Sequence, residues 1–178
     1  MAARLAAVQA DISVLAVQSI VNAANEPLIM GGGVDGAIRR KAGPAMEVEL
    51  RRIGHCPTGK AVITRGYDVA AKYVIHTVAP IWSSDKSRRH REVLLLASCY
   101  RSALALALEH EISEIAFPCL GTGVYGWPAD LAADTAFSTV SQFLREHEEI
   151  VRVIFCCFSR ADLDRYNALL NGAVAPSR

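Results

Sequence analysis

The sequence predicts an α/β fold: helices packed on a largely parallel sheet, within a single domain. Short apolar runs rich in Val, Ile and Phe recur along the chain with helical segments between them. Residues within these runs scarcely alternate between apolar and polar, which is typical of strands covered on both faces. The chain has 178 residues, of which 52% are hydrophobic and 21% charged. That is enough for one substantial core and too apolar for a disordered protein.

Five apolar runs are the predicted strands. They cover residues 17–23, 60–64, 72–78, 114–120 and 151–158. Sheets of this kind bind ligands in a crevice beyond the carboxyl ends of their parallel strands. Functional residues are therefore expected directly after these runs.

The clearest predicted helix covers residues 128–147, where apolar side chains recur at three-and-four spacing. Pro128 occupies a position that a first helical turn tolerates, and the apolar face is expected to lie on the sheet. A second helix is predicted to begin near Val34, and two more are predicted to cover residues 92–109 and 161–170. No repeat or linker divides the chain, so residues 1–178 are predicted to form one domain with irregular ends at 1–3 and 172–178.

The composition excludes several classes of protein. The 19 Lys and Arg residues nearly balance 18 Asp and Glu residues, which argues against binding nucleic acid or an anionic membrane by bulk charge. Any recognition of phosphate must therefore be local. The five cysteines form no C-x-x-C pair, so neither a disulfide framework nor a metal site is predicted, and a reducing cytoplasm is the expected location. Neither a membrane helix nor a signal peptide is expected.

Two glycine-rich loops directly follow predicted strands. The first runs over residues 22–36 and contains Gly31, Gly32 and Gly33, and the second covers residues 120–126. Such loops are either simple turns or phosphate sites, in which backbone N–H groups and a helix N-terminus hold the anion. Neither loop matches the G-x-G-x-x-G or G-K-[ST] patterns. Together they could hold a diphosphate between two walls of backbone N–H groups.

The order of motifs along the chain resembles a macrodomain. The resemblance spans Asp11 to about Leu169, and it is most specific to the MacroD-type branch and its bacterial O-acetyl-ADP-ribose deacetylases. The segments that carry it are Asn22–Asn25, Gly31–Ile38, Ala42–Gly43, Thr58–Ala61, Ile63–Tyr67, Lys72–Val78 with Pro80, Ala116–Pro118 and Thr122–Gly126. The resemblance implies a three-layer α/β/α sandwich with a mixed, largely parallel central sheet that binds ADP-ribose. No metal is expected, because no His, Cys and Asp cluster has ligand spacing, and no other cofactor is predicted.

The resemblance also implies which residues contact ADP-ribose. Asp11 and Ile12 would contact the adenine, and the alternative for Asp11, beside Ser13, is a helix cap. One wall of the diphosphate site would come from the first loop and the other from the second, and the tyrosine of the second loop would also contact the distal ribose. These loop residues are Gly32, Gly33 and Val34, and Gly121, Thr122, Gly123, Val124 and Tyr125.

Asn25 and Asp35 are the predicted catalytic residues. The amide of Asn25 would hold a hydroxyl of the distal ribose, and Asp35 would act as general base on the attacking water. Outside this context, Asp35 before Gly36 would be read as a turn residue. The activity that the resemblance implies is deacetylation of O-acetyl-ADP-ribose, with release of mono-ADP-ribose from protein carboxylates as a further reaction. The alternative is a non-catalytic ADP-ribose reader, or a binding protein that regulates a ribonuclease partner.

Other polar residues are given structural interpretations. His76 is predicted to be a hydrogen-bonded core histidine. Cys119 is predicted to be a buried thiol, because no His or acidic partner is placed beside it to make it a nucleophile. Cys156 and Cys157 are assigned to the core. A basic cluster around His90 is interpreted as a solvated loop face, with contact to RNA or a protein partner as the alternative; it consists of Lys86, Arg88, Arg89 and Arg91.

The chain departs from the family pattern at several positions. The glycine run is one shorter, with Met30 before Gly31, and Arg39 replaces a common His. Gln18 stands where an acidic residue is frequent, Gly121 replaces Ser, and Trp127 replaces a smaller aromatic residue. These departures are expected to affect substrate preference and rate more than the binding of ADP-ribose.

Overall fold

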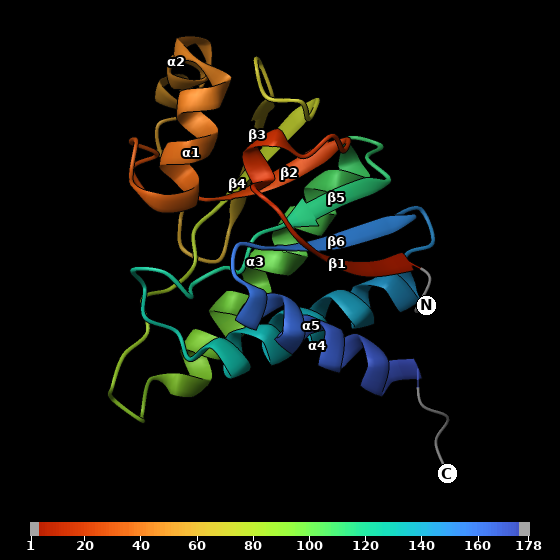
Figure 1. Ribbon diagram of the computed structural model, residues 1–178. Helices are drawn as coiled ribbons and strands as arrows, with labels where there is room; N and C mark the ends of the chain where they lie inside the picture. Colours follow the sequence, from red (N-terminus) through yellow and green to blue (C-terminus); the bar gives the residue numbers. More distant parts are fainter. Residues whose placement is uncertain (1–3, 175–178) are drawn as a thin grey trace.

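The computed structural model describes residues 4–174 and confirms the predicted three-layer α/β/α sandwich with a mixed sheet (Figure 1). The six strands lie in the order β1-β6-β5-β2-β4-β3. Every neighbouring pair is parallel except β3 and β4, which are antiparallel. The strands are β1 (Leu5–Gln9), β2 (Ser19–Ala23), β3 (Ala61–Arg65), β4 (Tyr73–Thr77), β5 (Glu114–Phe117) and β6 (Arg152–Cys157).

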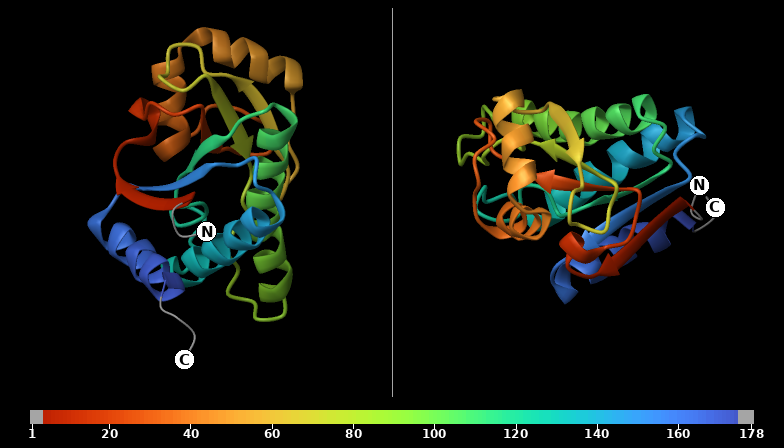
Figure 2. Two further views of the ribbon diagram at one scale, coloured as in Figure 1. Left: turned by 90° about the vertical axis from the view of Figure 1, so that its right-hand side faces the viewer. Right: turned by 90° about the horizontal axis from the view of Figure 1, so that it is seen from above.

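Two groups of helices cover the two faces of the sheet (Figures 1 and 2). One face carries α1 (Gly33–Ala42) and α2 (Pro44–Ile53), and the other carries α3 (Arg89–Glu109), α4 (Ala129–Glu146) and α5 (Arg160–Val174). Successive strand residues point to opposite faces. Ile20 and Val74 therefore pack in the core under α1 and α2, whereas Val21 and Ile75 pack in the core under α3 and α4.

The sequence prediction places five of the six strands and four of the five helices of residues 4–174. The missed strand is β1, an Ala-rich edge strand that is only half-buried over most of its length. The missed helix is α2, because Gly43 and Pro44 together resemble the end of a helix; Pro44 instead opens the next one. The predicted strand 114–120 ends at Phe117, since Pro118 follows and cannot donate to a ladder.

The ends of the chain are only partly described. Residues 1–3 and 175–178, predicted to be irregular, lie outside the described residues. Residues 172–174 belong to α5. No helix in the described part of the chain is long and apolar enough to cross a membrane.

The topology brings the loops after five strands to one edge of the sheet. The parallel strands β1, β6, β5, β2 and β4 all end there. Both glycine-rich loops leave from this edge, one after β2 and one after β5, which are direct neighbours. The sequence argument for a ligand crevice therefore applies to the point between these two strands.

Candidate functional site

Two adjoining cavities form a cleft at the carboxyl edge of the sheet. The inner cavity has a volume of about 310 Å³ and the outer cavity about 470 Å³. They share lining residues from both loops, among them Gly33, Val34 and Gly123. The cleft therefore runs between the two glycine-rich loops.

All twelve predicted site residues line this cleft. The outer cavity has Asp11, Ile12 and Thr122 in its wall in addition to shared residues. The inner cavity is lined by the remaining predicted residues, which are Asn25, Gly32, Gly33, Val34, Asp35, Gly121, Gly123, Val124 and Tyr125. The structure thus brings together residues from loops far apart in the sequence, and their contacts with a ligand stay a prediction.

The first loop presents the N-terminus of α1 to the cleft. Gly32 caps the helix in an extended conformation, and Gly33 begins it with a φ of +55°, in the left-handed region that favours glycine. A Cβ at Gly32 would meet no heavy atom within 4 Å, so the backbone here lies open to the cavity. The first N–H groups of a helix have no partner within it and carry partial positive charge.

The second loop is shaped by a close contact between glycine and tryptophan. Gly121 has a φ of +84°, and a Cβ there would lie 2.6 Å from Cδ1 of Trp127. The indole Nε1–H donates to the Pro80 carbonyl at 2.7 Å, and the Trp127 ring contacts that of Trp82 at a centroid distance of 4.8 Å. The two departures from the family pattern at positions 121 and 127 are therefore linked, because the larger indole leaves no room for a serine side chain.

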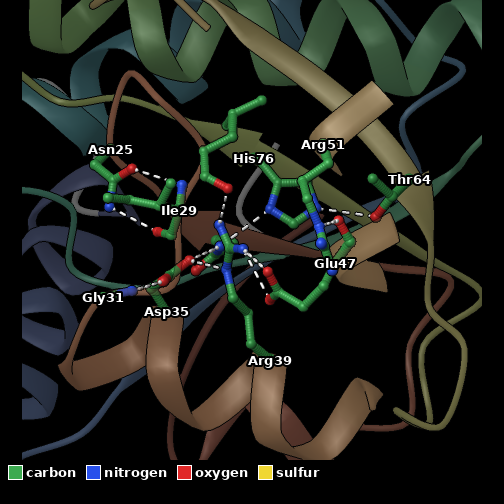
Figure 3. A network of polar contacts seen from close by, with 11 residues as sticks. Asn25, Ile29, Gly31, Asp35, Arg39, Glu47, Arg51, Thr64 and His76 are labelled. Carbon is green, nitrogen blue, oxygen red and sulfur yellow. Dashed lines mark hydrogen bonds and ion pairs between the residues drawn. The ribbon is translucent and has the colours of Figure 1, made fainter. Parts of the chain in front are cut away.

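Asp35 lies at the inner end of the cleft, is almost completely buried, and belongs to the polar network drawn in Figure 3. Its Oδ1 accepts hydrogen bonds from Asn22 Nδ2 at 2.6 Å and Arg39 Nε at 2.8 Å. Its Oδ2 accepts from the backbone N–H of Gly31 at 2.6 Å. The carboxylate is therefore held in one orientation, and it ties the glycine loop to β2 and α1.

Arg39 is a buried cation behind this carboxylate, with a side chain that is 0% exposed. Its Nη1 donates to both carboxylate oxygens of Glu47 at 2.9 and 3.0 Å, and its Nη2 donates to the Leu28 carbonyl at 3.1 Å. Arg39 therefore joins the catalytic candidate Asp35 to α2. A histidine side chain is too short to join both carboxylates in this way.

His76 is a core histidine, as predicted. Its Nδ1 lies 3.0 Å from Asn22 Nδ2, and its Nε2 lies 2.9 Å from the Thr64 hydroxyl. Complete burial and, to a smaller extent, the charge of Arg39 lower the pKa of His76 to about 3. The imidazole is thus neutral and supports Asn22, which in turn orients Asp35.

Asn25 and Asp35 approach each other across Gly31. A Cβ at Gly31 would lie 3.4 Å from Asp35 Oδ2 and 3.6 Å from Asn25 Nδ2. The Asn25 amide also closes its own loop, since Nδ2 donates to the Ile29 carbonyl and Oδ1 accepts from the Ile29 N–H. The predicted catalytic pair therefore shares one end of the inner cavity.

The outer cavity contains both predicted and unexpected residues. Asp11 caps a short 3-10 helix (Ile12–Val14) through Ser13, so the capping alternative is correct, and the residue lines the cavity as well. Phe158 lies in the wall although its side chain is 82% exposed. Phe158 directly follows β6, and this position at the carboxyl edge of the sheet could have identified it from the sequence. The sequence also gave no indication that Asp162 would line this cavity.

Cys119 is half-buried and lines both cavities. A hydrogen bond with Cys157 and burial both raise the pKa of the Cys119 thiol, so it is not activated as a nucleophile. Cys156 and Cys157 are buried in the core as predicted. Within residues 4–174, no group of three or more His, Cys, Asp or Glu residues is placed to hold a metal ion.

Comparison with known proteins identifies the family. Residues 21–136 match the Macro domain family. A macro domain-containing protein of Chlorobaculum tepidum is 52% identical over 164 residues, covering 92% of this chain and 94% of the relative. ADP-ribose glycohydrolase MACROD2 of Homo sapiens is 48% identical over 162 residues, which are 90% of this chain but only 38% of that protein. The Oceanobacillus iheyensis macrodomain, solved with ADP, superposes with a TM-score of 0.88 at 38% identity, covering 94% of this chain and 90% of that one.

An α/β/α sandwich with a cleft between two glycine-rich loops, at the carboxyl edge of its sheet, defines the macrodomain class of ligand-binding folds. The chain belongs to the macro domain family. The resemblance inferred from its motifs, including the MacroD-type branch, is thereby confirmed.

Proposed function

We propose that this protein binds ADP-ribose in the cleft and hydrolyses esters attached to the distal ribose. The adenosine would occupy the outer cavity, the diphosphate the space between the loops, and the distal ribose the inner cavity beside Asn25, Asp35 and Tyr125. The relatives support the ligand, since one is named an ADP-ribose glycohydrolase and a structural neighbour was solved with ADP. The observation that carries the proposal is the placement of Asn25 and Asp35 on both sides of Gly31 at the inner end of the cleft.

The diphosphate would be bound by the backbone rather than by basic side chains. In the described part of the chain, no Lys or Arg lines either cavity. The N-terminus of α1 supplies N–H groups on one side. On the other side, Gly123, Val124 and Tyr125 donate their N–H groups to no backbone carbonyl of residues 4–174. The near-neutral charge of the protein is thus compatible with a phosphate site.

The adenine would be held between a stacking ring and an acidic acceptor. Phe158 offers an exposed aromatic face in the outer cavity, and stacking of a base on such a ring is worth about 1–3 kcal/mol. Asp11 uses Oδ1 to cap the 3-10 helix, which leaves Oδ2 to accept a hydrogen bond from an exocyclic amine.

The reaction would use Asp35 as general base and Asn25 to align the ribose. In deacetylation, a water molecule would lose its proton to Asp35 Oδ2 and attack the ester carbonyl. The bond from the carbonyl carbon to the ribose oxygen would then break, and the ribose oxygen would take up the proton, giving acetate and ADP-ribose. In release from a protein carboxylate, the same water would attack the anomeric carbon and the carboxylate would leave.

The decisive experiment follows acetate release from O-acetyl-ADP-ribose by NMR and the release of ADP-ribose from a mono-ADP-ribosylated protein. The wild-type protein should release one or both products. Absence of release over hours, with intact binding of ADP-ribose, would support a non-catalytic reader and contradict the hydrolase proposal.

The matched variant is Asp35→Asn, which keeps the shape of the buried side chain beside Arg39. Turnover should fall by about 10²–10⁴-fold, the usual contribution of a general base, while calorimetry shows ADP-ribose affinity within a few fold of wild type. Asp35→Ala is less informative, because it removes every acceptor for the hydrogen bonds that Asn22, Gly31 and Arg39 donate to this side chain, whereas asparagine keeps one oxygen. Unchanged turnover in a folded Asp35→Asn protein would exclude the general-base role.

A further inference from the structure

A third cavity, here called the acceptor cavity, adjoins the inner cavity at its ribose end. It has a volume of about 530 Å³ and shares Asn25, Ala79 and Tyr125 with the inner cavity. Whatever is attached to the distal ribose in the proposed binding mode would therefore extend toward it. The remaining wall comes from the start of α3, from the segment between β4 and α3, and from Glu26, Pro27 and Thr58 of two other loops.

Both carboxylates of the acceptor cavity are partly engaged. Glu26 accepts hydrogen bonds from the backbone N–H of Thr58 at 2.9 Å and from its hydroxyl at 2.7 Å. Glu92 is 3% exposed, and its Oε2 accepts from the Ser83 N–H at 3.1 Å. Its Oε1 accepts no hydrogen bond from residues 4–174, and Arg88 Nε lies 3.7 Å away, beyond hydrogen-bond distance. Glu92 Oε1 is thus closed off from the cavity, and the nearby guanidinium of Arg88 offsets its charge.

The two cations of the acceptor cavity differ, since Arg88 forms an ion pair with Glu92 Oε1 at 3.7 Å whereas Arg91 is available to a ligand. The Arg88 side chain is 62% exposed, and Arg91 is exposed with no carboxylate of the described residues within ion-pairing distance. Arg89, between them in sequence, lies over the Trp82 ring at 5.6 Å from its centroid. The basic cluster is thus divided, because Arg88 and Arg91 line the acceptor cavity whereas Arg89 lies on Trp82. The loop interpretation of this cluster was only partly correct, since Arg89 and Arg91 belong to the first turn of α3.

An anion opposite the exposed guanidinium groups of Arg88 and Arg91 is offered by the side chains of an acidic polypeptide. An acidic side chain can approach Arg88 and Arg91 alone, whereas the continuous row of phosphates in RNA would also meet the carboxylates of Glu26 and Glu92 in the same wall. We propose that the acceptor cavity binds the polypeptide of an ADP-ribosylated protein, with an acidic side chain near the modified residue on Arg88 and Arg91. This inference rests on the proposed orientation of ADP-ribose in the cleft.

The test compares two substrates that share the same ADP-ribose part. One is O-acetyl-ADP-ribose, which does not reach the acceptor cavity, and the other is a synthetic peptide mono-ADP-ribosylated on one glutamate with acidic flanking residues. Arg91→Glu should lower kcat/KM for the peptide by about tenfold, as expected when one exposed charge pair becomes repulsive, and leave kcat/KM for O-acetyl-ADP-ribose within about twofold. With lysine-flanked peptide, Arg91→Glu should be the better enzyme.

The matched control is Arg101→Glu, the same charge change at another exposed position of α3. It should leave both substrates unaffected. Equal effects of Arg91→Glu on both substrates, or no effect on the peptide, would overturn the proposal. An oligoribonucleotide that binds wild type but not Arg91→Glu, and displaces no peptide, would assign the surface to RNA instead.

Failure of the proposed hydrolase function would be recognised separately, as absence of turnover of both substrates by wild type. The acceptor cavity would then be tested by calorimetry. The acidic ADP-ribosylated peptide should bind about tenfold more tightly than free ADP-ribose, and Arg91→Glu should remove this difference. Equal affinities in wild type would overturn the inference.

Discussion

The buried arginine behind the site should be a major contributor to stability. Replacing Arg39 by Met removes the ion pair to Asp35, the two hydrogen bonds to Glu47 and the bond to the Leu28 carbonyl. The Asp35 side chain is only 5% exposed, so water replaces little of the lost partner, whereas Glu47 is 23% exposed and can be better hydrated. Removing one partner of a buried pair costs about 3–5 kcal/mol.

Urea denaturation at pH 7 measures this cost directly. Arg39→Met should lower the free energy of unfolding by about 3–5 kcal/mol and the melting temperature by on the order of 10 °C. The control is Arg40→Met, the neighbouring exposed arginine, which should change stability by no more than about 0.5 kcal/mol. A loss below about 1 kcal/mol in Arg39→Met would refute the reasoning that the network stabilises the folded protein through this cation.

A double-mutant cycle then separates the two carboxylates. Combining Arg39→Met with Asp35→Asn should recover more stability than combining it with Glu47→Gln, because only Asp35 is left as a charge away from water. The coupling between Arg39 and Asp35 should approach the upper end of the range of about 0.5–3 kcal/mol found for contacting residues. Additive effects of the two substitutions would show that they are not coupled.

Three further predictions test other parts of the site. Gly32→Glu should fold normally, since Gly32 has a φ of −95° and its Cβ position is open, but it should abolish ADP-ribose binding in calorimetry. The control Gly32→Ala should bind ADP-ribose within a few fold of wild type. Binding by Gly32→Glu would contradict the backbone phosphate site. Phe158→Ala should weaken ADP-ribose binding by about 1–3 kcal/mol with an unchanged melting temperature, and unchanged affinity would exclude stacking. Burial lowers the pKa of His76 from 6.5 in the unfolded chain to about 3 in the folded protein. Between these two pH values the unfolded chain binds more protons than the folded protein. Stability is therefore lost as the pH falls from 6.5 toward 3, by up to about 1.4 kcal/mol per pH unit. Urea titrations at several pH values should show a shallower loss in His76→Gln, and an identical slope would assign the acid sensitivity to other groups.

Local patterns were sufficient to predict most of the fold. The central strands are continuous apolar runs because both of their faces are covered, and this signal is visible in the sequence. The edge strand β1 lacks that signal, since its alanines and half-buried positions carry little hydrophobic contrast. The helix α2 was missed for a different reason. Gly43, with a φ of +80°, ends α1 and directly precedes α2. A glycine at a turn indicates that one element ends, but it does not indicate whether a helix, a strand or a loop follows.

The glycine loops could be predicted, but the network behind them could not. Gly31, Gly32 and Gly33 are consecutive, so their capacity for a backbone nest is a local property. The partners of Asp35 come from β2 and α1, and Arg39 reaches Glu47 in a helix that the sequence did not reveal. Such contacts depend on how elements pack, and a sequence shows only that an arginine stands where a histidine is common.

The network also changes what a loss of activity at Asp35 would mean. The carboxylate holds the Gly31 N–H and the Arg39 guanidinium at the same time, so it shapes the glycine loop as well as facing the cleft. An inactive Asp35 variant therefore proves a chemical role only if the loop still binds ADP-ribose. Asp35→Asn with intact affinity and lost turnover would separate chemistry from loop geometry. A parallel loss of affinity would instead assign Asp35 to the positioning of Gly31–Gly33, and the water would need another base.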